Sequence, residues 1–136
     1  MPIRVGDRAE HHFVVEPADM EAFQKMSGDT SLIHTDREFA RSRGFDDVIA
    51  YGGIMLAHLS HVLGMKIPGA GGTSLRWTID YRRPLYVGAE ADIDFEVTGV
   101  SAATGVIDGK FRIVSGGKTI ATGSTQSMVP LDQIAE

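Results

Sequence analysis

Hydrophobic residues recur with different periods along the chain, and the N-terminal half shows mainly helical spacing. Residues 9–15 end in Phe-Val-Val and predict a first strand. Glu16-Pro17 then opens a helix, because proline is tolerated at the first helical position, and hydrophobic residues recur every three positions as far as Met26. Gly28 predicts the end of this helix, since glycine adopts the left-handed conformation at little cost.

A loop and a short helix are expected next. Residues 29–34 carry no periodic pattern and are predicted to form the loop. The run Thr35-Asp36-Arg37-Glu38 fits a capping box, which predicts a short helix to about Arg43. Gly44 is then expected to close this helix.

A second, more apolar helix is predicted directly after Gly52-Gly53. Polar side chains interrupt it at His58, Ser60 and His61, so it is interpreted as a buried helix of a globular domain and no membrane segment is predicted. The helix is expected to end at Gly64 or a little beyond. Its hydrophobic residues are Ile54, Met55, Leu56, Leu59, Val62 and Leu63.

From Thr73 onward, polar and hydrophobic residues alternate, which is the period of a half-buried strand. The predicted strands are residues 74–81, 90–100, 105–115 and 118–129, and Gly116-Gly117 suits a two-residue hairpin turn. The economical arrangement is an α+β fold in one domain, residues 1–136, with a curved antiparallel sheet wrapped around the long apolar helix.

Composition narrows the function classes. Hydrophobic residues make up 43% and charged residues 23%, as in soluble globular proteins. The net charge is −5 and no basic cluster is longer than Arg82-Arg83, which disfavours nucleic acid as a partner. The chain has no cysteine, so disulfides, thiolate nucleophiles and cysteine-ligated zinc are excluded. With no signal-peptide pattern at the N-terminus, a cytoplasmic location is predicted.

The first candidate site is formed by Asp29 and His34, which lie five residues apart in the predicted loop. A carboxylate and an imidazole held together can take up and return a proton near neutral pH. The alternative is structural: Asp29 caps a turn and His34 is an ordinary loop residue.

The second candidate site is Tyr51-Gly52-Gly53, at the start of the apolar helix. The first amides of a helix lack intrahelical acceptors and the macrodipole is positive there. A glycine lets a ligand approach these amides, so they can stabilise a carbonyl oxygen that gains charge; the alternative is a plain turn. Ser60, in the same helix, either bonds back to the carbonyl of Leu56 or supports the acid–base pair.

Metal and phosphate sites have little support in the sequence. His58 and His61 lie three residues apart, but no carboxylate stands at the offset of a helical zinc motif, so no metal site is predicted. His11 and His12 are neighbours in a strand and point to opposite faces, which makes them a poor chelate. The arginine pair Arg82-Arg83 is interpreted as solvated surface charge, with ligand phosphates as the alternative partner.

A family resemblance rests on the run from Phe23 to His34, followed six residues later by Ala40. This run resembles the signature of the MaoC-like dehydratases, which include the (R)-specific enoyl-CoA hydratases. Its aromatic, Gly, Asp, aliphatic and His positions match at the family's spacing, whereas Ser31-Leu32 replaces the family's Asn-Pro. Residues 49–55 and 79–88 resemble the second and third family motifs, with Tyr51 where the family usually has His.

The resemblance implies a hot-dog fold and an assembly of dimers or dimer-based higher oligomers, with active sites near the subunit interface. Asp29 and His34 would be the catalytic pair, and the Gly52 amide would donate to the thioester oxygen. Ser60 occupies the position of a helix serine that supports the site in the family. Three neighbours of the catalytic residues are also predicted to contact the substrate or support the site: Ser31, Tyr51 and Gly53. The implied substrate is an acyl-CoA thioester, with coenzyme A as part of the substrate and no other cofactor.

The predicted reaction is the reversible hydration of a trans-2-enoyl-CoA to an (R)-3-hydroxyacyl-CoA. Two alternatives from the same fold remain, an acyl-CoA thioesterase and a non-catalytic acyl-CoA-binding module. A third is a dehydratase acting on acyl carrier protein. The net charge of −5 does not favour such an acidic partner.

Overall fold

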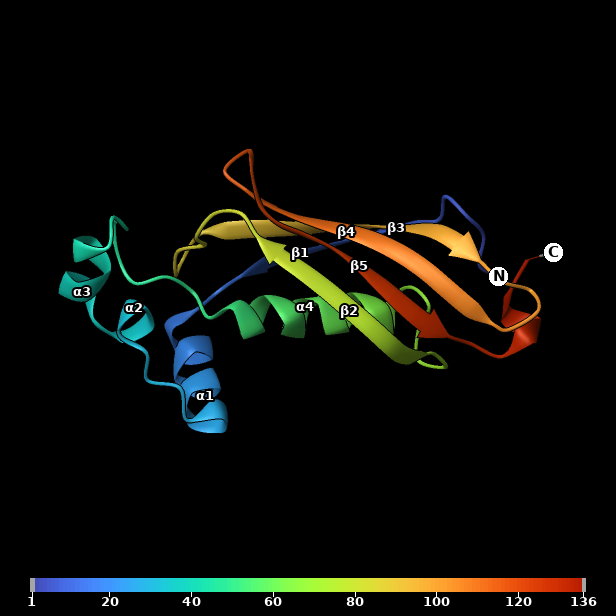
Figure 1. Cartoon of the computed structure of the whole chain (residues 1–136), viewed down its shortest axis with the longest axis horizontal. Coiled ribbons are helices and arrows are strands. Elements are labelled where there is room, and N and C mark those ends of the chain that lie inside the picture. The colour runs from blue at the N-terminus through green and yellow to red at the C-terminus, as the bar shows by residue number, and fades with distance from the viewer. Residues whose placement is uncertain (1, 136) are drawn as a thin grey trace.

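The computed structural model describes residues 2–135, and its elements follow the predicted order (Figure 1). Helices cluster in the N-terminal half, and four of the five strands in the described residues come after them. The elements are β1 (Arg8–Val14), α1 (Pro17–Ser27), α2 (Leu32–Thr35), α3 (Arg37–Ser42), α4 (Gly52–Met65), β2 (Thr73–Tyr81), β3 (Glu90–Val100), β4 (Val106–Ser115), β5 (Lys118–Met128) and a 3₁₀ turn (Leu131–Gln133).

The strands form one curved antiparallel sheet in the order β1-β3-β4-β5-β2, and α4 runs along one of its faces (Figure 1). Strands consecutive in the chain, β3, β4 and β5, are neighbours, whereas β1 and β2 form the two edges. The α+β prediction of a sheet wrapped around a long helix is therefore confirmed.

The core lies between α4 and the sheet. Leu59 and Val62 are completely buried on the sheet side of α4, and alternate residues of β3, such as Ile93 and Val97, are completely buried opposite them. This alternation explains the period-two pattern in the C-terminal half of the sequence, since successive side chains of a strand point to opposite faces. No helix within residues 2–135 has the length and hydrophobicity needed to cross a membrane.

Glycines end or join elements where the sequence predicts. Gly28 follows α1 with φ of 73°, and its N–H bonds to the carbonyl of Gln24, so it closes the helix in the left-handed conformation. Gly116 and Gly117 both have positive φ, 58° and 75°, and join β4 to β5 as a tight hairpin requires. Gly28 thereby fixes the point from which the Asp29 loop leaves the helix.

Two predictions for residues 29–38 are wrong in detail. The predicted loop contains one helical turn, α2, which is too short to show a hydrophobic period. The cap of α3 is Asp36, whose carboxylate accepts from the Phe39 N–H at 3.1 Å. Thr35 instead donates to the carbonyl of Ser31 at 3.1 Å, so its hydroxyl stabilises α2.

The helices α1, α2 and α3 gather beyond the N-terminal end of α4, away from both chain ends (Figure 1). This arrangement brings the Asp29 loop, His34 in α2 and the start of α4 to the same end of the molecule. The predicted acid–base pair and the predicted oxyanion site are therefore neighbours in space, although 18 residues separate His34 from Gly52 in the sequence.

Candidate active site

His34 is held by the backbone of the segment that precedes α4. Its Nδ1 lies 2.8 Å from the carbonyl oxygen of Ile49, and a carbonyl can only accept, so Nδ1 carries a proton. In the neutral imidazole, Nε2 is then the free acceptor. The His34 ring also stacks on the Tyr51 ring, with centroids 4.2 Å apart. Position and tautomer of this histidine are thus both set for a general base.

Asp29 keeps its carboxylate ionised through local hydrogen bonds. Its Oδ1 accepts from the Ser31 N–H at 2.9 Å and from the Ser31 hydroxyl, and these two bonds lower the pKa of the Asp29 carboxyl. The positive charge of a protonated His34 imidazole would lower the pKa of Asp29 further. Within residues 2–135 no hydrogen bond joins the Asp29 and His34 side chains, which leaves them available to a bound molecule.

The start of α4 provides unbonded amides beside this pair. The Gly52 N–H has no acceptor among residues 2–135, as expected at the first position of a helix. A Cβ on Gly52 would lie 2.5 Å from the Tyr81 hydroxyl oxygen, and a Cβ on Gly53 would overlap the Phe23 ring. A side chain at Gly52 would therefore displace the exposed Tyr81 ring, and one at Gly53 would disturb the packing of α1 on α4.

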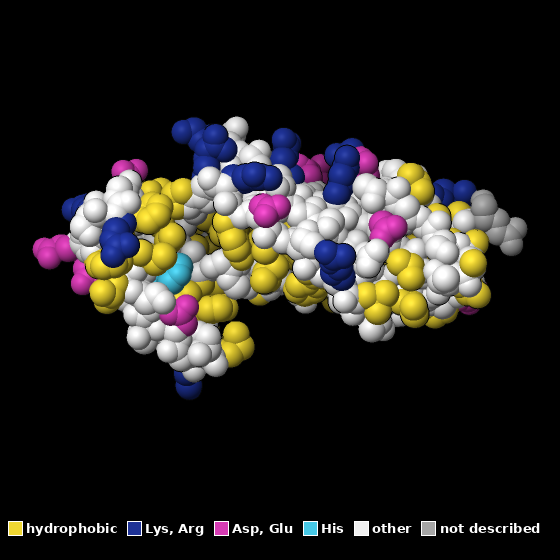
Figure 2. All heavy atoms as spheres, viewed as in Figure 1, with side chains coloured by type: hydrophobic (Ala, Val, Ile, Leu, Met, Phe, Trp, Pro, Cys, Tyr) yellow, Lys and Arg dark blue, Asp and Glu magenta, His cyan; other side chains and the backbone are white. Residues whose placement is uncertain are grey.

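A pocket of about 410 Å³ connects His34 with Gly52. Most of its wall is hydrophobic, with Phe45, Ile49, Ala50, Met55, Pro84 and Leu85. Tyr81, Arg82 and Arg83 line its remaining side. Figure 2 shows hydrophobic side chains gathered in the hollow between the helical region and the sheet. An apolar pocket with a few convergent polar groups is the usual form of a small-molecule site.

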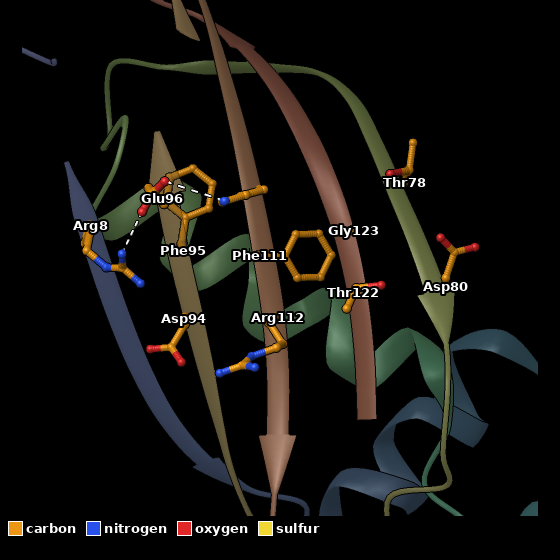
Figure 3. Close-up of a pocket in the computed structure, with 11 residues that line it drawn as sticks. Arg8, Thr78, Asp80, Asp94, Phe95, Glu96, Phe111, Arg112, Thr122 and Gly123 are labelled. Carbon is orange, nitrogen blue, oxygen red and sulfur yellow. Dashed lines mark hydrogen bonds and ion pairs between the residues drawn. The ribbon is translucent and has the colours of Figure 1, made fainter. Parts of the chain in front are cut away.

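A larger hollow of about 560 Å³ lies on the face of the sheet away from α4 (Figure 3). Three of its charged side chains are paired with each other. Arg8 lies 2.6 Å from Glu96, and Lys110 lies 3.7 Å from a second oxygen of the same carboxylate. None of the predicted site residues lines it. We therefore place the candidate active site in the pocket between His34 and Gly52.

Comparison with known proteins identifies the family. Residues 4–119 match the family model described as MaoC like domain, which covers most of the chain. This chain belongs to the MaoC-like domain family. The family resemblance seen in the sequence is therefore confirmed.

Relatives of this MaoC-like chain include two proteins named (R)-specific enoyl-CoA hydratase. The one from Aeromonas caviae is 28% identical over 94% of this chain and 96% of its own length. The one from Rhodospirillum rubrum is 25% identical over 94% of this chain and 89% of its own length. Both alignments thus extend over nearly the whole of each protein.

Solved structures show the same fold. The (R)-hydratase from A. caviae involved in PHA biosynthesis superimposes with a TM-score of 0.88 at 28% identity, over 94% of this chain and 98% of that chain. The R-hydratase PhaJ1 from Pseudomonas aeruginosa gives 0.85 at 26% identity, over 94% and 83%. The predicted hot-dog fold is therefore confirmed for this MaoC-like protein.

Ser60 lies apart from the other predicted site residues of this MaoC-like chain. It is exposed, and it lines a small hollow of about 80 Å³ with Trp77 and Ser127. Eight residues separate it from Gly52, which is about 12 Å along a helix. The structure brings together Asp29, Ser31, His34, Tyr51 and Gly52, whereas Ser60 lies outside this group.

Three of the other histidines, His11, His58 and His61, form a separate cluster. His11 Nε2 lies 3.1 Å from His58 Nδ1, and the His11 ring stacks on His61 with centroids 4.2 Å apart. His12 lies on the opposite face of β1 beside Asp92. Within residues 2–135 no three His, Asp or Glu side chains are arranged to bind a metal ion. Burial lowers the pKa of both His11 and His58, so these rings are neutral near pH 7.

Sequence reasoning missed three contributors to the site. The Ile49 carbonyl orients His34, and Tyr81 faces the first turn of α4. Arg82 and Arg83 line the pocket, whereas the sequence favours solvated surface charge. The third family motif contains Tyr81 and both arginines, so this motif was the available signal. A backbone carbonyl such as that of Ile49 leaves no signal in a sequence.

The geometry of Asp29 leads to a prediction about its titration. Ser31→Ala removes the hydroxyl bond that contributes most to the lowered pKa, so the Asp29 pKa should rise toward its ordinary value. The ¹³C chemical shift of the Asp29 carboxyl, followed by NMR as a function of pH, measures this change. Ser42→Ala is a matched control, because the Ser42 hydroxyl bonds to the Phe39 carbonyl and not to Asp29. An unchanged titration in Ser31→Ala would contradict the assigned cause.

Proposed function

We propose that this protein catalyses the reversible hydration of trans-2-enoyl-CoA thioesters to (R)-3-hydroxyacyl-CoA. The observation that carries the proposal is the geometry of His34. The Ile49 carbonyl fixes the His34 imidazole in the tautomer of a general base, and the unbonded Gly52 amide lies in the same pocket. The names of the two full-length relatives support the substrate class and the (R) configuration.

The proposed steps use His34 and Gly52 from this pocket and Asp29 from the adjoining loop. Water is held between Asp29 and His34, and the pair accepts one of its protons as the water oxygen bonds to C3 of the enoyl group. Electron density moves to the thioester oxygen, where the Gly52 N–H donates to the developing enolate. A good donor of this kind typically contributes about 3 kcal/mol. The pair then returns a proton to C2, which completes the addition of water.

The pocket rim suits a phosphorylated thioester. Arg82 and Arg83 line it, and each guanidinium is oriented by a neutral oxygen, Thr122 Oγ1 at 3.3 Å and the Thr119 carbonyl at 2.9 Å. Within residues 2–135 neither forms an ion pair with a carboxylate, so both remain available to anions. Guanidinium groups bind phosphate oxygens well, which favours a coenzyme A thioester. No further cofactor is proposed, and the proposed active form is a homodimer or a dimer-based oligomer.

The test is an absorbance assay with crotonyl-CoA and longer trans-2-enoyl-CoA thioesters. Hydration removes the conjugated double bond, so the enoyl absorbance should fall, and chiral analysis of the product should give the (R) isomer. Crotonyl-pantetheine, which lacks the phosphates, should be hydrated with a clearly higher KM. Loss of that difference would contradict the role of the two arginines.

The alternatives give different results in the same assay. A thioesterase would release free thiol, whereas hydration leaves the thioester bond intact. A binding module would bind crotonyl-CoA in calorimetry without turning it over. Either outcome, or an (S) product, would overturn the proposed reaction.

A further inference from the structure

We propose that Tyr51 is a positioning residue that holds Asp29 in place relative to His34 through its hydroxyl group. The inference rests on the proposed hydratase function for its kinetic consequence, whereas its structural basis is independent of the substrate. Tyr51 lies where the chain enters α4, immediately before Gly52.

Both ends of the catalytic run are tied to the same short segment, residues 49–51. At the His34 end, the Ile49 peptide makes two bonds: its carbonyl accepts from His34 Nδ1 at 2.8 Å, and its N–H donates to the Ile33 carbonyl at 3.0 Å. At the Asp29 end, the Tyr51 hydroxyl donates to the Asp29 carbonyl at 2.5 Å. The segment therefore sets the spacing between the base and the carboxylate.

The other hydrogen bonds of Asp29 are local. Its N–H donates to the Ser27 hydroxyl at 3.1 Å, and its carboxylate accepts from Ser31. These bonds define the shape of the loop, but they move with the loop because all partners lie within two residues. Within residues 2–135, the bond from Tyr51 is the one hydrogen bond that connects Asp29 to a distant part of the chain.

Tyr51 is itself immobilised, which a positioning group requires. Its side chain is only 2% exposed and packs between two rings, with centroids 4.6 Å from Phe23 and 4.2 Å from His34. The next peptide unit begins α4 and carries the Gly52 amide. One residue thus contacts Asp29 through its hydroxyl and His34 through its ring, and is covalently joined to the oxyanion donor.

The segment that carries Tyr51 is anchored to the sheet side of the pocket. The Ala50 N–H donates to the Leu85 carbonyl at 2.7 Å, and Ile49 forms an isolated bridge with Tyr86. Leu85 is 1% exposed and Ala50 is 4% exposed, so this attachment lies in the core. Tyr51 therefore connects Asp29 to a segment that is bonded to the core of the fold.

The decisive variant is Tyr51→Phe, which removes the hydroxyl and keeps the ring that packs between Phe23 and His34. We expect kcat for crotonyl-CoA to fall by about 10- to 100-fold, because a misplacement of about 1 Å can cost 10²-fold. KM should change less than about twofold, since the pocket wall is intact. The matched control is Tyr86→Phe, which removes another tyrosine hydroxyl, the exposed acceptor of the Asp46 N–H, and keeps the backbone bridge to Ile49, so kcat should be unchanged.

Two readouts separate positioning from a general structural effect. Amide hydrogen exchange in residues 28–31 should become faster in Tyr51→Phe, whereas exchange of the Ile49 amide, bonded to Ile33, should not. The Asp29 pKa should stay low in this variant, because both Ser31 bonds remain. Ser31→Ala should show the opposite combination, with a raised Asp29 pKa.

The outcomes are distinguishable from failure of the proposed function. If the unsubstituted protein hydrates no enoyl-CoA, the proposed function fails, while the exchange measurement still decides the hydrogen bond. Unchanged kcat in folded Tyr51→Phe, or a lowered kcat with unchanged exchange in residues 28–31, would overturn the inference. In the unsubstituted protein, the Tyr51 hydroxyl proton should exchange slowly enough to give an NMR resonance with contacts to residues 28–31. Its absence would contradict the bond without any variant.

Discussion

Asp29→Asn and His34→Ala should each lower kcat/KM for the hydration of crotonyl-CoA by about 10²- to 10⁴-fold, the contribution of a positioned acid–base group. Asparagine keeps the size of Asp29 and an oxygen that accepts from Ser31, but it cannot take a proton from water. Alanine removes the His34 imidazole. Initial rates measured by loss of enoyl absorbance over a range of substrate concentrations provide kcat and KM separately.

Structural damage is separated from chemistry by a second substitution of the histidine. His34→Gln retains an N–H group that can donate to the Ile49 carbonyl, but it has no base, so its activity should be as low as that of His34→Ala. Asp46→Asn and His12→Ala change an exposed carboxylate and an exposed imidazole outside the pocket and should be fully active. Hydratase activity near the unsubstituted level in both Asp29→Asn and His34→Ala would show that the roles are assigned wrongly.

The double variant Asp29→Asn/His34→Ala adds a test of cooperation within the pair. Residues that act on the same proton transfer are strongly non-additive. The double variant should therefore be little slower than the worse of the two single variants. Fully additive losses would indicate that Asp29 and His34 act in separate steps.

Local features of the fold could be predicted from the sequence because their causes are local. The alternating pattern of β3 to β5 reflects one buried and one exposed face. Gly28 ends α1 through its own conformation, and the apolar run after Gly52 gives α4. The errors lie where no period exists, in the single turn of α2, or where adjacent residues could both cap a helix, as with Thr35 and Asp36.

The arrangement of the site depends on contacts between residues distant in sequence. The bond from Tyr51 to Asp29 spans 22 residues, and the bond from His34 to Ile49 spans 15. Neither leaves a periodic signal. The placement of β2 at the sheet edge is likewise set by long-range pairing with β5, and it brings Tyr81 and the two arginines to the pocket. The family motif identified the catalytic candidates, but not what holds them.

Glycines inside the sheet show the same dependence on non-local contacts. A Cβ on Gly109 would overlap the Phe95 ring, and a Cβ on Gly123 would lie 2.5 Å from the Phe111 ring. In each case an aromatic ring of one strand occupies the space above a glycine of the next strand. Neither glycine has the positive φ that marks a turn, so their requirement comes from packing and not from backbone conformation.

Gly123→Ala should destabilise the protein by about 2 kcal/mol or more, because overpacking typically costs 1–3 kcal/mol and the clash here includes backbone. The new Cβ would overlap the Thr78 carbonyl oxygen as well as the Phe111 ring. Thr78 belongs to β2, so relief of the clash must shift the strand that ends at Tyr81 in the pocket. Reduced hydratase activity should therefore accompany the loss of stability. Urea unfolding measures the free energy of unfolding of the variant and the unsubstituted protein.

The matched control is Gly64→Ala, the same chemical change near the end of α4. A Cβ there meets nothing within 4 Å, so the substitution should stabilise the protein by about 0.5–1 kcal/mol through helix propensity alone. The two Gly→Ala variants are thus expected to shift the free energy of unfolding in opposite directions. A destabilisation of similar size in both would mean that the loss in Gly123→Ala does not come from the contact with Thr78 and Phe111.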